Sequence, residues 1–340
     1  MKNWQTFSTR QLNKKLFIAL LAAGVVLAVI LSICVGTVSV SVSDIVKLLF
    51  GKEISPVHRS IILYARVPRT IGCLLAGAAL AVSGAVIQTV LSNPLAAPNI
   101  IGVNSGAGMA VAIGCAFFPA AVNFIPLMAF FGALAGILLV LFVAERNGAS
   151  KITLVLAGVA VSSIFGAVID AVISFVPDAL NGYSDFRIGG FSNLPMSRLL
   201  PAAWVIVPVL ILLTLLSTEL DILSLGTDTA KSLGLSARKL QILFLALAAA
   251  LSGAAVSFAG LLGFVGLIVP HIIRSICGQE SRYLIAGSAF GGAFMLTLCD
   301  TVARTVFAPY ELSVGIILSF IGGPFFIWLL LKQRGGRIHD

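Results

Sequence analysis

Apolar runs of about twenty residues recur along almost the whole chain, and few charges interrupt them. A helix needs roughly 20 apolar residues to cross the hydrocarbon core of a membrane, because each residue adds only about 1.5 Å to its length. Hydrophobic residues make up 59% of the 340 residues and charged residues only 10%, whereas soluble domains carry about 25% charged residues. These features exclude a water-soluble fold and predict an all-α polytopic membrane protein with about ten transmembrane helices.

Charged or turn-forming residues bound each predicted span. We expect one transmembrane domain over residues 16–331, preceded by a cytoplasmic segment at 1–15 and followed by a cytoplasmic tail at 332–340. The eighth span is too short for a full crossing and directly follows the seventh, so it is the weakest of the set. The expected spans are residues 16–36, 67–91, 100–118, 124–144, 152–176, 199–217, 239–259, 261–273, 283–307 and 312–331.

Ten spans place both termini on the same side of the membrane, and the distribution of basic residues selects that side. With the N-terminus inside, 14 of the 22 Lys and Arg residues fall in cytoplasmic segments and the other 8 fall outside. Because short cytoplasmic loops carry an excess of Lys and Arg, we predict that both termini are cytoplasmic.

Several arginines fall at the predicted outer face. In ARVPRTIG, Arg66 and Arg69 lie three residues apart around Pro68, at the expected start of the second span, and therefore share one helix face. A cation at a helix N-terminus is disfavoured by the helix dipole, so negative charge is expected from outside. Lipid phosphates reached by snorkelling or an acidic protein partner could both supply it. Arg304 follows Asp300 by four residues, which permits an intrahelical ion pair as well as contact with a partner.

Two segments combine irregular composition with membrane depth. LSNPLAAPNIIGVNSGAG (91–108) holds prolines, asparagines and glycines but no charge, so it either lines a pathway or makes a tight cytoplasmic turn. In GLLGFVGLIVPHIIR (260–274), Gly263 and Gly266 are expected to let the short eighth span pack closely. Pro270 is expected to end that span.

The longest polar cytoplasmic stretch separates the sixth and seventh spans, at residues 217–241. Asp228 could cap a short helix that runs through Ala230 and Gly234. Such a helix suits a groove in another protein, although a solvated connector would have the same composition.

No catalytic or metal-binding pattern emerges from the sequence. The chain lacks G-x-x-x-x-G-K-[ST], and its three histidines lie far apart without metal-ligand spacing. We therefore expect a non-enzyme that binds neither a metal nor ATP. Asp170 and Asp300 raise one alternative, a secondary transporter driven by an ion gradient, because intramembrane carboxylates often couple ions.

The motifs resemble a known family. ARVPRTIGCLLAGAALAVSGAVIQTVLSNPLAAPNIIGVNSGAG (65–108) resembles the N-terminal signature of the FecCD-type permeases, the membrane subunits of ABC importers for iron–siderophore complexes, haem and cobalamin. Four later blocks match the family in order, so the resemblance covers nearly the whole chain. These blocks are YSDFRIGGFSNL, LSLGTDTAKSLGLSARKLQ, SGAAVSFAGLLGFVGLIVPHIIR and CDTVARTVFAPYELSVGIILSFIGGPFFIWLLL.

The resemblance implies a type II ABC importer permease fold in the plasma or inner membrane of a prokaryote. It also implies three kinds of partner: a second permease subunit, either a copy or a paralogue, two cytoplasmic ATPase subunits that bind ATP with Mg²⁺, and an extracytoplasmic substrate-binding protein. A ferric siderophore is the expected cargo, with cobalamin and haem as alternatives. The chain itself is expected to hold no cofactor.

The resemblance also assigns roles to individual residues. Arg66, Arg69 and Arg304 match outer arginines that meet acidic residues of the binding protein. The coupling loop, at about 218–238, matches a helix that enters a cleft of the ATPase, and the short eighth span beside it is expected to move when ATP binds. The residues of the coupling loop that are predicted to contact the ATPase are Thr229, Ala230, Ser232, Leu233 and Gly234. The predicted gate residues at the cytoplasmic constriction are Asn93, Pro94, Leu95, Lys151 and Ile152, of which Lys151 and Ile152 depart from the small or hydroxylated residues usual there.

Overall fold

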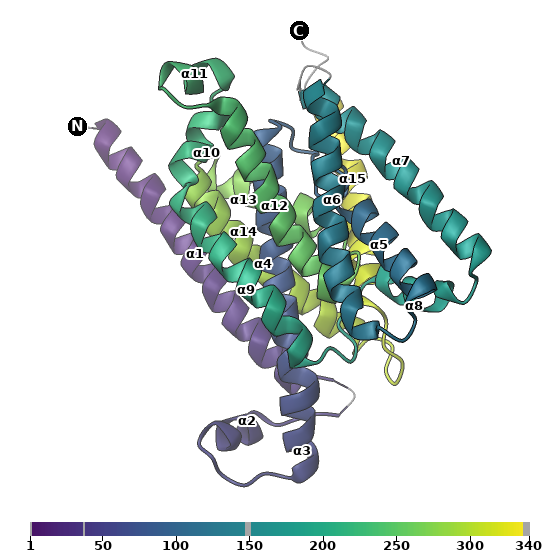
Figure 1. The fold of residues 1–340 in the computed structure, drawn as a ribbon. Helices are drawn as coiled ribbons and strands as arrows, with labels where there is room; N and C mark the ends of the chain where they lie inside the picture. Colours follow the sequence, from purple (N-terminus) through teal and green to yellow (C-terminus); the bar gives the residue numbers. More distant parts are fainter. Residues whose placement is uncertain (1, 37, 147–150, 336–340) are drawn as a thin grey trace.

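The structure is a computed structural model that describes residues 2–36, 38–146 and 151–335, and every regular element within these ranges is a helix (Figure 1). Seven helical stretches of the described chain are long and apolar enough to cross a membrane, and three more apolar helices are shorter. They confirm the predicted fold class, and each falls on one of the ten expected spans. The ten helices are α1 (Lys2–Cys34), α4 (Val67–Val90), α5 (Val103–Phe117), α6 (Ile125–Arg146), α7 (Lys151–Phe175), α9 (Met196–Leu215), α12 (Ala237–Ala259), α13 (Val265–Cys277), α14 (Ser281–Ala303) and α15 (Val314–Gly335).

The bundle has two distinct ends (Figure 1). Both termini lie at one end, here called the terminal end, together with α10 (Ser217–Ser224) and α11 (Thr227–Ser232). At the opposite end, here called the projecting end, α2 (Val42–Leu49) and α3 (Pro56–Ser60) extend beyond the other helices. The helix α8 (Ala179–Ile188) and the short turn η2 (Val122–Phe124) also lie there.

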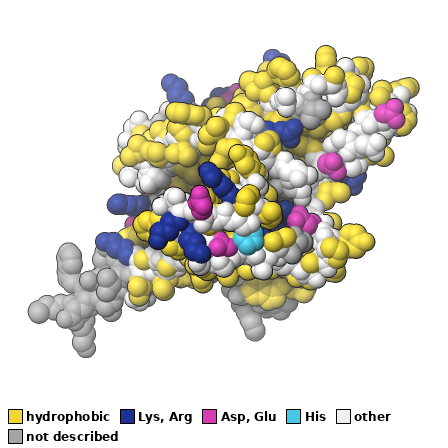
Figure 2. All heavy atoms as spheres, turned by 90° about the horizontal axis from the view of Figure 1, so that it is seen from below, with side chains coloured by type: hydrophobic (Ala, Val, Ile, Leu, Met, Phe, Trp, Pro, Cys, Tyr) yellow, Lys and Arg dark blue, Asp and Glu magenta, His cyan; other side chains and the backbone are white. Residues whose placement is uncertain are grey.

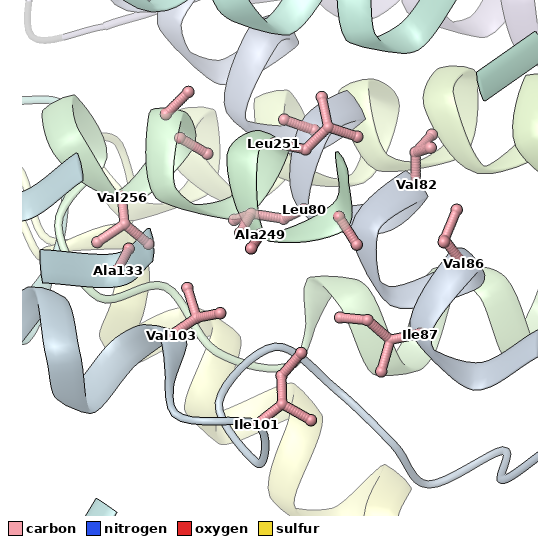
Figure 3. Close-up of a cluster of buried hydrophobic side chains, with 14 of the residues drawn as sticks. Leu80, Val82, Val86, Ile87, Ile101, Val103, Ala133, Ala249, Leu251 and Val256 are labelled. Atoms are coloured by element: carbon pink, nitrogen blue, oxygen red, sulfur yellow. The ribbon is translucent and has the colours of Figure 1, made fainter. Parts of the chain in front are cut away.

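Helix α4 forms the centre of the bundle. It packs against α12, α13 and α14, and 83% of its most apolar stretch is buried, compared with 11% for α1. Its buried side chains meet those of α5, α6 and α12 in one apolar cluster (Figure 3). Glycines allow this close packing, because a Cβ on Gly77 would lie 2.2 Å from the carbonyl oxygen of Gly292 in α14. Small residues at helix contacts are typical of membrane proteins, where lipid supplies no hydrophobic force between helices.

The helix around Arg66 and Arg69 begins earlier than expected. Residues Pro56–Val90 form one continuous helix of 35 residues, made of α3, the π-helical stretch η1 (Ile61–Arg66) and α4. Pro68 lacks an N–H donor, and the wider turn before it, in which the N–H of Val67 donates to Ile62, lets the helix continue. The two arginines are therefore inside a helix, so the prediction that they lie at a helix N-terminus is wrong.

Candidate functional site

At the projecting end, Arg69 joins three parts of the chain. Its Nε lies 2.9 Å from Oδ2 of Asp300 and its Nη2 lies 3.0 Å from Oδ1, so the guanidinium grips this carboxylate with two N–H groups. Its Nη1 donates to Oε2 of Glu311 at 2.6 Å. Asp300, on α14, is fully buried, whereas the side chain of Glu311, between α14 and α15, is 38% exposed. Arg69 thus ties α4 to α14 and to the segment that follows it.

Arg66, the last residue of η1, joins the 35-residue helix to the end of α1. Its guanidinium donates to the carbonyl oxygen of Cys34 at 2.9 Å, and also to those of Ile33 and Val38. The residue is only 5% exposed. Because the last carbonyls of a helix lack partners and carry partial negative charge, a buried arginine at this position stabilises the end of α1.

Arg304 also binds groups near the end of α1. Its Nη2 donates to the carbonyl and the hydroxyl of Ser32, at 2.6 and 2.8 Å, and the residue is 4% exposed. Its Nε lies 3.6 Å from Asp300, so the expected intrahelical pair exists, although Asp300 makes its closer contacts with Arg69. The structure therefore brings the three predicted docking arginines into one cluster and engages all of them within the chain.

The segment at residues 91–102 turns back into the bundle after α4 ends. A Cβ on Gly158 would lie 2.1 Å from the carbonyl oxygen of Ile100, and one on Gly266 would lie 3.4 Å from Pro98. Gly158 lies seven residues inside α7, which places the returning chain at membrane depth. Ile101 is fully buried in the central cluster (Figure 3). The segment is therefore more than a tight turn, and its irregular backbone is buried at residues 96–98, 101 and 102.

The predicted gate residues lie at the terminal end of this segment and at the start of α7. Oδ1 of Asn93 accepts a hydrogen bond from the N–H of Leu95 at 2.9 Å, and both residues are half-buried, whereas Pro94 is exposed. Ile152 is 73% exposed. Lys151 is the first residue of α7, and its side chain lies outside the described part. The gate assignment remains a prediction.

Helix α13 does not end at Pro270, as the sequence predicted, but continues to Cys277. A proline inside a helix leaves the carbonyl four residues earlier without its N–H donor, and here that carbonyl belongs to Gly266. Nε2 of Gln88, on α4, donates to this oxygen at 3.1 Å. The helix therefore continues because a neighbouring helix supplies the missing donor.

The two glycines before this proline have different roles. A Cβ on Gly84 of α4 would lie 1.9 Å from the carbonyl oxygen of Gly266, so the predicted close packing at Gly266 is confirmed. The same prediction for Gly263 is wrong, because a Cβ there would have no neighbour within 4 Å. Gly263 lies before α13 begins, in the link from α12.

Polar contacts hold α13 against α4, and they were not predicted from the sequence. Nη1 of Arg274 donates to Oε1 of Gln88 at 2.6 Å, and Nη2 donates to the carbonyl of Ala85 and the hydroxyl of Thr89, at 3.1 and 2.8 Å. Gln88 is 2% exposed and links Arg274 to the free carbonyl of Gly266. A glutamine within an apolar span was the available signal, since such a side chain needs partners in lipid.

The predicted coupling segment contains a short helix, α11, at the terminal end. Gly226, with φ +115°, precedes it, so Asp228 is within the helix and is not its N-cap. Ala230 is fully buried, whereas Leu233 is 59% exposed. Gly234, with φ +78°, ends the turn in a conformation that favours glycine.

The remaining coupling residues are on the surface of α11. Thr229 and Ser232 are exposed, and the Ser232 hydroxyl donates to the carbonyl of Thr229 at 2.8 Å. Behind α11, Oδ1 of Asp221 in α10 accepts a hydrogen bond from the N–H of Ser281 at 2.8 Å. Helix α10 therefore joins α11 to the first turn of α14.

Helix α2 was not expected from the sequence. The hydroxyl of Ser41 accepts a hydrogen bond from the N–H of Asp44 at 3.1 Å and caps the helix. Oδ2 of Asp44 lies 2.8 Å from Nδ1 of His58, which joins α2 to α3. This hydrogen bond lowers the pKa of Asp44. The spacing of Ser41 and Asp44 before an apolar run is a capping pattern that could have revealed the helix.

A cavity of about 770 Å³ opens at the projecting end, between α8, the end of α12 and residues 311–313. Asp178, the residue before α8, Asp185 of α8 and Arg198 are among the residues that line it. Glu311 also lines this cavity, so the outer partner of Arg69 borders an open space.

Comparison with known proteins agrees with this architecture. Residues 24–332 match the FecCD transport family. The chain is 37% identical over 285 residues to the hemin transport system permease protein HmuU of Yersinia pestis, covering 81% of this chain and 84% of that protein. It is 36% identical over 345 residues to the vitamin B12 import system permease protein BtuC of Citrobacter koseri, covering 98% of this chain and all of that protein.

A solved structure has the same fold. A metal-chelate type ABC transporter, in an inward-facing conformation, superposes with a TM-score of 0.83 and 28% sequence identity, covering 93% of this chain and 98% of that one. The family match runs from the second half of α1 into α15, and the fold agrees over nearly the full length. The chain therefore belongs to the FecCD transport family.

Proposed function

We propose that this chain is the permease subunit of a binding-protein-dependent ABC importer and that its cargo is a ferric siderophore. The family match over residues 24–332 carries this proposal. Relatives include permease proteins named for hemin, Fe(3+)-citrate, iron(3+)-hydroxamate and vitamin B12. Iron chelates are the commonest cargo among these names, and cobalamin and haem are the alternatives.

The terminal end faces the cytoplasm in this proposal. The basic residues in its connecting segments favour that orientation, and it places α11 where a cytoplasmic ATPase can reach it. A second permease subunit, two ATPases and an extracytoplasmic binding protein complete the transporter. ATP with Mg²⁺ binds to the ATPase subunits, and this chain acts as a non-catalytic conduit.

Helix α11 is the proposed contact with the ATPase. Its buried Ala230 fixes it to the bundle, while Leu233 is available to a partner. Movement of α11 would pass through α10 to α14, because Asp221 holds the first turn of α14. Helix α14 packs along α4 and α13. The close contacts of Gly77 with Gly292 and of Gly84 with Gly266 would therefore shift when the ATPase moves α11.

The proposed docking site for the binding protein still includes Arg66, Arg69 and Arg304. Among them, Arg69 has the most favourable position, since its Nη1 partner Glu311 is partly exposed and borders the open cavity. The rival proposal, an ion-driven transporter that uses Asp170 and Asp300, has less support. Asp300 is held by two N–H groups of Arg69, an arrangement typical of a structural ion pair.

Growth of a deletion strain tests the importer role and its cargo. We expect the strain to lose growth when one class of ferric siderophore is the sole iron source, and to recover with a plasmid copy of the gene. Growth on soluble ferrous salts is the control and should be unchanged. A defect confined to hemin or to cobalamin would overturn the cargo assignment, and normal growth on the whole panel would contradict the importer role.

A further inference from the structure

The segment at residues 38–60, here called the outer projection, is held together by contacts between its own residues. The Ser41 cap starts α2, and the contact between Asp44 and His58 joins α2 to α3 at 2.8 Å. Val40 is only 3% exposed, which anchors the start of the projection. Its far end continues without a break into the 35-residue helix that contains α4.

The length of that helix places its first turns outside the hydrocarbon core of the membrane. Thirty-five residues give a helix of about 52 Å, whereas the hydrocarbon core is about 30 Å thick. Figure 1 shows α2 and α3 beyond the ends of all the other helices. The outer projection is therefore at the outermost part of this end of the bundle.

The exposed surface of the projection combines an apolar stripe with basic residues. Val42, Val46 and Phe50 are spaced four residues apart along one side of α2 and are 56%, 45% and 78% exposed. The basic side chains of Lys47, Lys52 and Arg59 are exposed around them. Figure 2 shows this end of the molecule, where dark blue Lys and Arg side chains lie among apolar ones and beside magenta acidic ones. Glu53 is the exposed acidic residue of the outer projection, so the exposed charge of the projection is basic overall. An apolar centre with a polar rim and an aromatic anchor is typical of a protein interface.

The arginines deeper in the same end are already engaged. Arg66 and Arg304 are 5% and 4% exposed and bind groups of α1. An approaching acidic surface would therefore meet Lys47, Lys52 and Arg59 first. We propose that the outer projection is a docking surface for an acidic face of the extracytoplasmic binding protein, with Phe50 as its apolar anchor. This inference rests on the proposed importer function.

Binding measurements on the complete transporter in nanodiscs test the proposal. The probe is the binding protein whose co-expression with the transporter gives ferric-siderophore uptake. K47E/K52E/R59E should weaken its binding about tenfold at roughly 0.02 M salt and less at roughly 0.15 M salt, because salt screens exposed charges. V46S/F50S should weaken binding about tenfold at both salt concentrations, because it removes apolar contact area.

The charge-matched control reverses three exposed basic residues at the terminal end, as K15E/K239E/R282E, and should leave binding unchanged. Co-elution with the ATPase subunits checks that each variant is assembled. Equal binding by the parent, K47E/K52E/R59E and V46S/F50S would overturn the inference while leaving the importer function intact. Failure of every candidate binding protein to support uptake by the parent would instead count against the proposed function.

A fluorescent variant separates protein contact from lipid contact. The emission of F50W, measured as the difference from the parent, should shift to shorter wavelength when the binding protein is added, because the indole leaves water. Brominated lipids should not quench it. Quenching by brominated lipids without the binding protein would show that α2 lies on the membrane and would overturn the proposal.

Discussion

Near each end of α4 an arginine joins this helix to a neighbour, but the two arginines have different kinds of partner. At the projecting end, Arg69 is held by the carboxylates of Asp300 and Glu311. Towards the terminal end, the bonds that Arg274 makes to α4 go to neutral groups of Gln88, Ala85 and Thr89. Separating opposite charges in a low-dielectric interior costs far more than exchanging neutral hydrogen bonds. The difference leads us to expect a rigid projecting end and a terminal end whose contacts exchange more easily.

Removing the charge of Asp300 should have the largest effect on stability. D300N leaves Arg69 and Arg304 buried without a compensating carboxylate at this position, and breaking a buried ion pair costs about 3–5 kcal/mol. Thermal unfolding of the purified chain in detergent measures the loss.

E311Q is the matched control for D300N, because it removes the partly exposed partner of the same arginine. It should change the free energy of unfolding by less than about 1 kcal/mol. Equal losses for D300N and E311Q would contradict the assignment of Asp300 as the main partner.

Leucine at Gly266 should have the next largest effect. The side chain would meet the backbone of Leu80 and Gly84, and overpacking of this kind costs about 1–3 kcal/mol. We expect G266L to abolish uptake, because it forces α13 away from α4. G263A has open space and should leave both stability and uptake within error of the parent, so a loss in G263A equal to that in G266L would refute the contact.

Gln88 tests the neutral network directly. Q88M keeps the volume of the side chain but leaves the carbonyl of Gly266 without its donor and Arg274 without one acceptor. An unsatisfied buried group costs about 1–3 kcal/mol, and uptake should fall with stability. If Q88M unfolds at the same temperature as the parent, α13 continues past Pro270 without the hydrogen bond that Gln88 donates to Gly266.

The smallest effect is expected in the outer projection and depends on pH. Because its hydrogen bond to His58 holds the pKa of Asp44 below the ordinary value, the stabilisation is present above that value. It is lost as the pH falls through the folded-state pKa. The difference in Tm between the parent and D44N should therefore persist from neutral pH to about pH 5 and shrink below about pH 4. A difference that grows on acidification would contradict this assignment.

The spans were predictable because each depends on a local property, the apolar content of about twenty consecutive residues. The errors arose where a distant residue decides the outcome. Nothing in the sequence near Pro270 shows that α4 will supply a hydrogen-bond donor. The donor is Gln88, which precedes its acceptor Gly266 by 178 residues. In the same way, the sequence near Asp300 suggests Arg304, whereas its closer partner Arg69 lies 231 residues away.

The site was predictable to a smaller extent. The resemblance to the family located Arg66, Arg69 and Arg304, and the structure shows that they cluster. Spacing predicted the pair between Asp300 and Arg304, but it could not predict the contacts with α1 or the closer contact between Asp300 and Arg69. Helix α2 has a local signal, the Ser41 and Asp44 cap, but its apolar run is too short to resemble a membrane span. Short amphipathic helices of this kind are indicated by their caps and not by their apolar length.

ATP-driven uptake by reconstituted vesicles tests most directly whether this chain is a conduit powered through α11 by a separate ATPase. Vesicles that hold the complete transporter, with the binding protein and ATP on opposite sides and the proton gradient collapsed, should accumulate the ferric siderophore. Vesicles that hold this chain alone should accumulate none, with or without an ion gradient. Accumulation by the lone chain under an ion gradient would contradict the account.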